Sequence, residues 1–211
     1  MPPDHATRSP RVRVLPLPYH GGSVALPLIL PTMPLTAELQ CRAMTHADLP
    51  HVLALQHICY QPDFHEPLDA FESKLRAAPD TCWVISAEHA GVLAYLVSLP
   101  VADESYPVLH ACQCDASTLP DELYLHDMAI SPVLRGRGAS RRLLQMAIEQ
   151  ANSMGLQRLS LIAVQNSASF WMRHGFHARL PTSPQVADKL ASFGSDAMLM
   201  SHTLAHNLGG A

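Results

Sequence analysis

Residues 124–144 read YLHDMAISPVLRGRGASRRLL and join three kinds of local structure in one segment. An apolar run typical of a strand ends at Pro132, a loop with two glycines follows, and an apolar pattern with helical spacing begins after it. Such a segment presents unpaired backbone N–H groups at a helix N-terminus, where they attract an anion. Gly136 and Gly138 allow a close approach that a Cβ would block. The segment therefore predicts a pyrophosphate site, with an ordinary glycine turn before a helix as the alternative.

The glycine loop differs from two common nucleotide motifs. No Gly-Lys-Ser/Thr follows it, so it is not the P-loop of a nucleotide triphosphatase. Its glycine spacing also departs from the dinucleotide fingerprint. The anion that it binds is therefore expected to belong to another kind of ligand.

The composition limits the class of protein. The chain has 211 residues, of which 48% are hydrophobic and 15% charged, enough for the core of one domain. A net charge of -4 argues against a nucleic-acid partner, which would need a basic face. Arginines gather instead around 135–142, which suits a small anionic ligand, although an arginine-rich nucleic-acid contact there is a further alternative. No stretch is long enough to span a membrane, so no membrane partner is expected.

The cysteines indicate a reducing compartment. Their number is five, which is odd, and most stand in or near apolar segments. This pattern favours a cytoplasmic protein with buried thiols over a disulfide framework. Cys112 and Cys114 form a C-x-C pair without a second pair nearby, so no metal site is expected.

The first 36 residues differ from the rest of the chain. Residues 1–36 contain eight prolines, which interrupt every possible helix or strand, and Pro27 breaks an apolar run that resembles a signal sequence. We interpret 1–36 as a disordered leader, or as an upstream extension of a protein whose domain begins after Met33. A single domain is predicted over 37–205, followed by a tail at 206–211.

The hydrophobic pattern predicts an α/β protein. Strands are expected at 38–43, 82–87, 92–99, 122–131, 159–164, 176–179 and 198–204. Helices are expected after Asp48, around 68–75, over about 140–154 and at 167–174, while 102–121 and 182–197 are expected to be loops. This order corresponds to a mixed sheet with helices on it.

Two motifs in this order carry a family resemblance. MAISP at 128–132 leads into RGRGA at 135–139, and further along Asn166 precedes FWMRHGF at 170–176. With these motifs and this element order, the chain resembles the GNAT superfamily of acetyl-CoA-dependent N-acyltransferases over residues 38–204. The loop departs from the family pattern Arg/Gln-x-x-Gly-x-Gly/Ala at its last place, where Ser140 stands; serine is small and can cap the helix.

The resemblance implies a fold and a co-substrate. The fold is a GNAT-like mixed, mostly antiparallel central sheet with about four helices packed on its faces. The co-substrate is acetyl-CoA, without a metal, and its pyrophosphate would lie on the loop amides while its pantetheine arm pairs with the backbone of Met128 and Ile130. The implied CoA-binding residues are Met128, Ala129, Ile130, Arg135, Gly136, Arg137, Gly138, Ala139, Ser140, Asn166 and Trp171, and Arg141 or Arg142 could add charge.

The implied activity is N-acetylation of a primary amine by direct attack in a ternary complex. Within the superfamily, LHDMAI at 125–130 and FWMRHGFH at 170–177 are similar to the serotonin (arylalkylamine) N-acetyltransferase group. A small amine or aralkylamine is therefore the expected acceptor, selected by residues around 60–71 and 182–197. The alternatives are a peptide or protein acceptor, through an N-terminus or a lysine, and a non-catalytic acyl-CoA sensor. We expect a monomer or a homodimer.

The catalytic residues are predicted from the alternation of side chains along the strand. Tyr124, His126, Met128 and Ile130 should share one face, and Asp127 should lie on the other. His126 is the predicted base, because an imidazole titrates near neutral pH, although it could also be a hydrogen-bonded wall residue.

The leaving thiolate has no obvious proton donor in this sequence. Many relatives carry a tyrosine where this chain has Trp171, and an indole cannot deliver a proton. Tyr124 is the predicted acid, and Trp171 could instead be a wall of the cofactor slot. Cys41 and Cys59 have no activating base in the sequence, so an acetyl-cysteine route is not expected.

Overall fold

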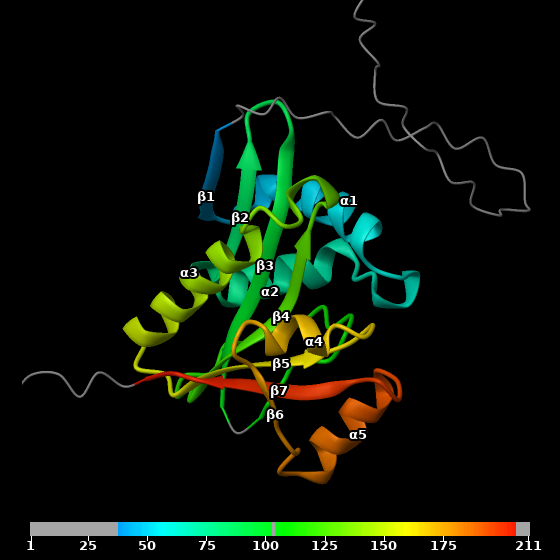
Figure 1. Cartoon of the computed structure of the whole chain (residues 1–211). Coiled ribbons are helices and arrows are strands. Elements are labelled where there is room, and N and C mark those ends of the chain that lie inside the picture. The colour runs from blue at the N-terminus through cyan, green and yellow to red at the C-terminus, as the bar shows by residue number, and fades with distance from the viewer. Residues whose placement is uncertain (1–37, 103, 206–211) are drawn as a thin grey trace, which may run out of the picture. The chain divides into compact units, whose positions relative to one another are not determined.

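The computed structural model describes residues 38–102 and 104–205, so the predicted leader and tail lie outside the described residues. Its centre is a seven-stranded sheet in the order β1-β2-β3-β4-β5-β7-β6, in which only β4 and β5 pair in parallel (Figure 1). The strands are β1 (Leu39–Ala43), β2 (Cys82–Ala87), β3 (Gly91–Val101), β4 (Glu122–Ile130), β5 (Arg158–Ala163), β6 (His177–Ala178) and β7 (Met198–Thr203). The predicted mixed, mostly antiparallel sheet is confirmed.

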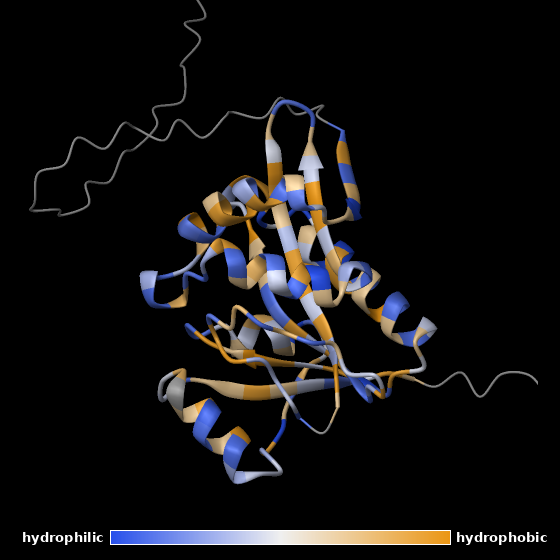
Figure 2. Ribbon diagram, turned by 180° about the vertical axis from the view of Figure 1, so that it is seen from behind, coloured by the Kyte–Doolittle hydropathy of each residue, from blue (hydrophilic) through white to orange (hydrophobic). Residues whose placement is uncertain are grey.

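The described helices cover both faces of this sheet. They are α1 (Leu49–Cys59), α2 (Leu68–Ala77), α3 (Ala139–Ser153), α4 (Ala168–Met172) and α5 (Pro184–Ser192), with short 3-10 turns between elements. One core cluster joins α3 and α4 to one face. Two further clusters join α1, α2 and α5 to the opposite face. The orange stretches along the central strands in Figure 2 belong to these buried surfaces.

Helix ends follow the chemistry of their terminal residues. Thr45 and Asp48 form a capping box, and the Asp48 carboxylate accepts from the backbone N–H and the hydroxyl of Thr45 at 2.8 Å each. After the C-terminus of α3, Gly155 has φ +70° and Leu156 N–H donates to Ala151 O at 2.9 Å. This arrangement ends α3 at the predicted place.

One helix was not predicted. Residues 182–197, expected to be a loop, contain α5. Ser183 caps this helix by accepting from Val186 N–H at 3.3 Å, and Pro184 occupies its first position. Val186 is buried and Leu190 packs beside it, so one apolar stripe attaches α5 to the sheet.

An irregularity in β4 determines which side chains face which helices. Val97 pairs with Asp127 and Ser98 with Leu125, so His126 is an extra residue, a β-bulge. β4 pairs with β5 only from Glu122 to Tyr124, and the two parallel strands diverge beyond that point. The bulge at His126 therefore changes the direction of the β4 side chains just beyond the point where the pairing of β4 with β5 ends.

Across residues 38–102 and 104–205, every helix is too short or too polar to cross a membrane.

Candidate active site

The diverging strands β4 and β5 open into a cavity of about 700 Å³. Ser131 N–H donates to Leu93 O on β3 at 2.8 Å, and alternation along an antiparallel strand then turns the backbone groups of Ile130 and Met128 away from β3. Their carbonyl oxygens accept from Cys59 Sγ at 3.4 Å and from Tyr60 Oη at 2.8 Å, respectively. The backbone N–H groups of Met128 and Ile130 thus face the gap between β4 and β5, where they could donate to an extended ligand chain such as pantetheine.

One end of the cavity is the N-terminus of α3. The first i→i−4 bond of this helix runs from Arg142 N–H to Gly138 O at 3.0 Å, so the amides of its first turn lack intrahelical acceptors. Gly136 and Gly138 have φ +74° and +80°, which favours glycine, and a Cβ at either would meet no protein atom within 4 Å. The open space above these amides fits a phosphate group.

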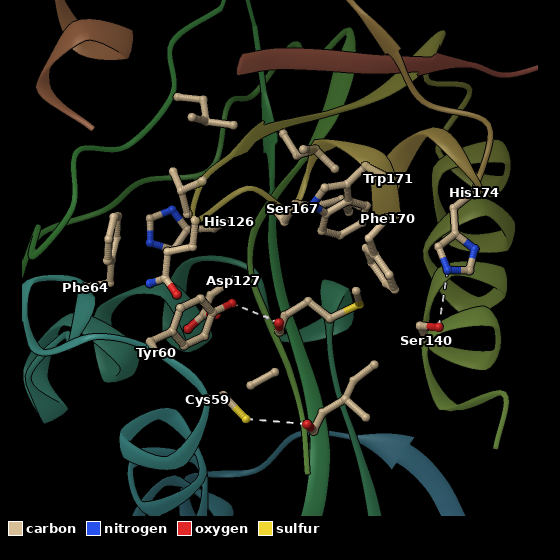
Figure 3. A pocket seen from close by; sticks show the side chains of 18 of the residues that line it. Cys59, Tyr60, Phe64, His126, Asp127, Ser140, Ser167, Phe170, Trp171 and His174 are labelled. Atoms are coloured by element: carbon tan, nitrogen blue, oxygen red, sulfur yellow. Dashed lines mark hydrogen bonds between the residues drawn. The ribbon is translucent and has the colours of Figure 1, made fainter. Parts of the chain in front are cut away.

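Cationic and polar side chains surround this helix end. Arg135, Arg141 and Ser140 line the cavity, and the Ser140 hydroxyl lies 3.3 Å from His174 Nε2 (Figure 3). Burial, together with Arg141 and Arg173, lowers the pKa of His174, as expected in a positive field. The site therefore has the charge that an anionic pyrophosphate requires.

Most of the predicted CoA-binding residues gather around the cavity. Those that line it are Met128, Ala129, Ile130, Arg135, Gly136, Gly138, Ala139, Ser140 and Trp171. Two others do not line it. Arg137 is exposed and its N–H donates to Leu134 O at 3.1 Å, whereas Asn166 N–H donates to Asp196 Oδ2 at 3.0 Å. Both assignments stay predictions without support from the cavity.

The opposite end of the cavity contains a buried charged chain. His126 Nε2 lies 3.0 Å from Glu66 Oε2, and Glu66 Oε1 accepts from Lys74 Nζ at 3.0 Å. The three side chains are 3%, 1% and 0% exposed, respectively. Burial raises the pKa of Glu66, but His126 and Lys74 outweigh burial and hold it at about 2. His126 Nδ1 is buried and has no hydrogen-bond partner among the described residues.

A second carboxylate lies beside His126. Asp127 Oδ2 accepts from Tyr95 Oη at 2.7 Å, and Asp127 Oδ1 is buried without a partner among the described residues. Burial raises the pKa of Asp127, although the nearby Tyr60 and Tyr95 hydroxyls oppose this effect. Figure 3 shows Asp127, Tyr60, Phe64 and His126 on one side of the cavity, opposite Trp171 and His174.

The predicted faces of β4 were wrong because of the bulge. Met128 and Ile130 pack in the cluster beneath α3. Tyr124 and His126, which were expected on that same face, lie on the face of α1 and α2, where their ring centroids are 5.8 Å apart. Asp127, expected on the face opposite His126, joins them in lining the cavity. The extra residue shifts the alternation, so both catalytic candidates approach the cavity from the other face.

Trp171 is both a core residue and a wall of the cavity. It is 9% exposed and packs against Phe170 and Phe176 with centroid distances of 5.1 and 5.4 Å. The Tyr124 hydroxyl makes no hydrogen bond within the described part of the chain, and burial raises its pKa well above the ordinary value. Tyr124 therefore keeps its proton at neutral pH and can donate a hydrogen bond, although burial makes it a weaker acid.

The cysteines near the site are not activated. Cys59 lines the cavity, and burial raises the pKa of its thiol although Arg135 acts in the opposite direction. Burial likewise raises the pKa of Cys41. A nucleophilic cysteine needs a lowered pKa, so neither thiol has the required environment.

The predicted acceptor region supplies only part of the lining. Tyr60, Phe64 and Glu66 line the cavity, as does Phe193 after α5, but His57, His65 and Asp69 do not. Sequence reasoning missed Lys74, since a lysine on a helix is usually a solvated charge. It also missed Leu109, which lies in the long loop before β4 and gave no periodic signal.

Solved structures with the same fold are numerous, at low identity. The loading GNATL domain of CurA from Lyngbya majuscula aligns with a TM-score of 0.62 and 12% identity, covering 81% of this chain and 100% of that one. The ribosomal-protein-S18-alanine N-acetyltransferase from Escherichia coli aligns with a TM-score of 0.56 and 16% identity, covering 82% and 100%. The PaiA N-acetyltransferase from Thermoplasma acidophilum, in complex with coenzyme A, aligns with 0.55 and 10%, covering 79% and 99%.

The family itself is shown by the sequence. No curated protein matches the chain significantly. The model of the Acetyltransferase (GNAT) family, however, matches residues 49–176, more than half of the 211 residues. This span contains β4, the glycine loop and α3, which form the phosphate end of the cavity. The serotonin (arylalkylamine) group is finer than these comparisons show and stays a prediction. With the family motifs placed around one cavity, the chain belongs to the GNAT family of acetyltransferases.

Proposed function

We propose that this protein transfers the acetyl group of acetyl-CoA to the primary amine of a small apolar or aromatic molecule. The observation that carries the proposal is the position of His126. It is a buried imidazole, bonded on one nitrogen to Glu66 and unpartnered on the other, in the wall of a cavity with a cationic end. The similarity to the serotonin (arylalkylamine) group supports the same class of acceptor.

The residues around α3 fit CoA. The free amides of the first turn and Gly138 would hold the pyrophosphate, and Arg135 and Arg141 would add charge-assisted hydrogen bonds. The edge of β4 would pair with the pantetheine arm. When bound, acetyl-CoA supplies the thioester whose acetyl group is transferred.

The other end of the cavity fits an amine with an apolar body. Asp127 Oδ1 is a buried carboxylate oxygen without a partner among the described residues, and an ammonium group would satisfy it. Phe64 lies on the same side of the cavity as Asp127 (Figure 3), and Leu109 and Phe193 add further apolar side chains to the lining. A buried carboxyl group beside aromatic side chains favours an amine with an aromatic or aliphatic substituent.

The proton must leave the amine before attack, because a primary ammonium has no lone pair. His126 would accept this proton through Nδ1, because imidazole is the side chain most often used as a general base. The amine nitrogen then attacks the acetyl carbonyl carbon directly. As the C–N bond forms, the C–S bond breaks, the CoA thiolate departs, and the nitrogen releases its second proton, which balances the charge of the thiolate. Tyr124, which retains its phenolic proton, is the candidate hydrogen-bond donor that stabilises that thiolate.

The experiment is acetyl-CoA turnover, followed by release of free thiol, with aralkylamines, polyamines, amino acids and short peptides as acceptors. His126→Gln should lose roughly 100-fold or more in kcat while retaining CoA binding by calorimetry. His89→Gln, whose side chain is 89% exposed, is the matched control and should behave as the wild-type protein. Turnover with peptides alone would replace the small amine by a peptide acceptor. CoA binding with no turnover would indicate a sensor.

A further inference from the structure

The two oxygens of the buried Glu66 carboxylate have different hydrogen-bond partners. Its Oε1 accepts from Lys74 Nζ at 3.0 Å and from the backbone N–H of His110 at 2.7 Å. Its Oε2 has the imidazole of His126 as partner, at 3.0 Å. One oxygen is therefore held by two donors, and the other is directed at the proposed base.

The backbone of Glu66 is held as firmly as its side chain. Gln56 on α1, which is fully buried, accepts from Glu66 N–H at 2.8 Å and donates to Glu66 O at 3.0 Å. Lys74 on α2 also lies near Ala70 O and Ala111 O, at 3.4 and 3.5 Å. Contacts from α1, α2 and the loop before β4 thus fix this carboxylate in one position.

The chemistry of a carboxylate decides which imidazole nitrogen carries the proton. Glu66 is ionised at neutral pH, since its pKa lies at about 2. An ionised carboxylate only accepts hydrogen bonds, so the group at 3.0 Å must be Nε2–H of His126. In the neutral ring the lone pair then belongs to Nδ1, the nitrogen that has no partner among the described residues.

We propose that Glu66 is a positioning residue that holds His126 in the Nε2–H form, so that Nδ1 accepts the proton from the amine. This inference rests on the proposed function, in which His126 is the base. Lys74 acts one step further back, because it fixes the Glu66 oxygen that does not face the ring. Neither Glu66 nor Lys74 needs to contact the acetyl group.

The charged and titratable groups around the His126 ring come from three elements. Glu66 faces it from the segment before α2, with Lys74 of α2 behind that carboxylate. Asp127 and Tyr124 lie beside it on β4. Glu66 and Asp127 are therefore the two carboxyl groups nearest the ring, and Glu66→Gln removes the one that is hydrogen-bonded to it.

The first test needs no substitution. Nitrogen-15 NMR of the histidine-labelled wild-type protein, with His126 assigned by its absence in His126→Gln, reports which ring nitrogen carries the proton. We expect a protonated Nε2 and an unprotonated Nδ1 at pH 8. A protonated Nδ1 in the neutral ring would overturn the proposal.

Glu66→Gln tests the consequence for catalysis. The amide oxygen should face the two donors, Lys74 and His110 N–H, which leaves the amide NH₂ to donate to His126 Nε2. That contact would force the proton onto Nδ1 and remove the lone pair that the reaction uses. We expect kcat to fall by about 10- to 100-fold, with CoA affinity unchanged and the acid limb of the kcat/KM profile moved to lower pH. Glu88→Gln, 89% exposed, makes the same chemical change elsewhere and should have no effect.

Because Glu66→Gln leaves the Lys74 ammonium buried without its counterion, the double variant Glu66→Gln/Lys74→Met provides a second folded background. A folded double variant with wild-type kcat and an unchanged pH profile would overturn the role of Glu66. The failure of the proposed function has a different signature. In that case the wild-type protein would acetylate no amine, or His126→Gln would retain full activity, whatever the NMR spectrum shows.

Discussion

The Lys74–Glu66 pair makes a prediction about stability that is separate from catalysis. Its atoms are 3.0 Å apart and both side chains are at most 1% exposed. At an effective dielectric constant of about 20, such a pair attracts by roughly 5 kcal/mol, and the desolvation of both ions offsets most of that gain. Glu66→Gln leaves Lys74 buried without an anion and should cost about 3–5 kcal/mol. Lys74→Met should cost about 2 kcal/mol, because Glu66 keeps the donors at His126 and His110.

The double variant distinguishes this account from simple loss of packing. When both charges are removed, neither ion remains unpaired, and the loss should return to about 1–2 kcal/mol. The coupling free energy in the double-mutant cycle is therefore expected to be about 3–6 kcal/mol. Urea unfolding at pH 7, followed by circular dichroism, measures all four proteins. Additive losses within about 0.5 kcal/mol would refute the reasoning, since they would mean that the two charges do not compensate each other.

Three further predictions address the acid limit, the phosphate end and the glycine loop. Arg42 holds the pKa of Asp48 at about 2 instead of 3.8, so the stabilisation of the fold by ionised Asp48 is present above pH 3.8 and is lost as the pH falls toward 2. Because the Arg42 side chain is 40% exposed, this stabilisation should amount to only about 1 kcal/mol. Urea titrations of the wild-type protein and Asp48→Asn at about pH 5 and pH 2.5 should show that the variant lacks it. An unchanged pH dependence in Asp48→Asn would contradict this. Arg141→Gln should weaken CoA binding by about 1 kcal/mol, roughly fivefold in Kd, with a smaller loss at high salt, as calorimetry at two ionic strengths can measure. Gly138→Ala should destabilise the domain by about 1–2 kcal/mol through its φ of +80°, without a clash, and a Tm equal to that of the wild-type protein would count against the glycine's conformational role.

Much of the fold was predictable because each strand and most helices carry local signals. The hairpin β2–β3, the glycine loop and the C-terminus of α3 all lie where apolar periodicity and glycine predict them. The missed helix α5 also had a signal. Ser183 followed by Pro184 is a typical helix start, and Val186 and Leu190 have helical spacing.

The geometry of the site was less predictable because one residue changes the register. His126 was identifiable from the sequence, but a β-bulge has no distinct sequence signal in this strand, and the strict alternation placed Tyr124 and Asp127 wrongly. Lys74 could not be assigned either. Lys74 is buried because its ammonium group pairs with Glu66, which in turn bonds to His126 on β4 and to His110 in the loop before it. Those partners are distant in the sequence, so no local pattern around Lys74 indicates its burial.

The two ends of the cavity present different chemical groups to their ligands: backbone groups at the CoA end and side chains at the acceptor end. We therefore expect acceptor specificity to depend on the side chains of the second end. At the CoA end the backbone of β4 and the amides of α3 make the expected contacts, and backbone groups constrain the sequence only through glycine and through geometry. That is consistent with a shared fold at 10–16% identity among the solved structures compared above. At the other end the expected contacts come from side chains, among them those of Phe64 and Asp127. A change of acceptor should therefore follow from substitutions at these two positions. CoA affinity should remain nearly constant, because both side chains lie across the cavity from Ser140 and His174 at the α3 end (Figure 3).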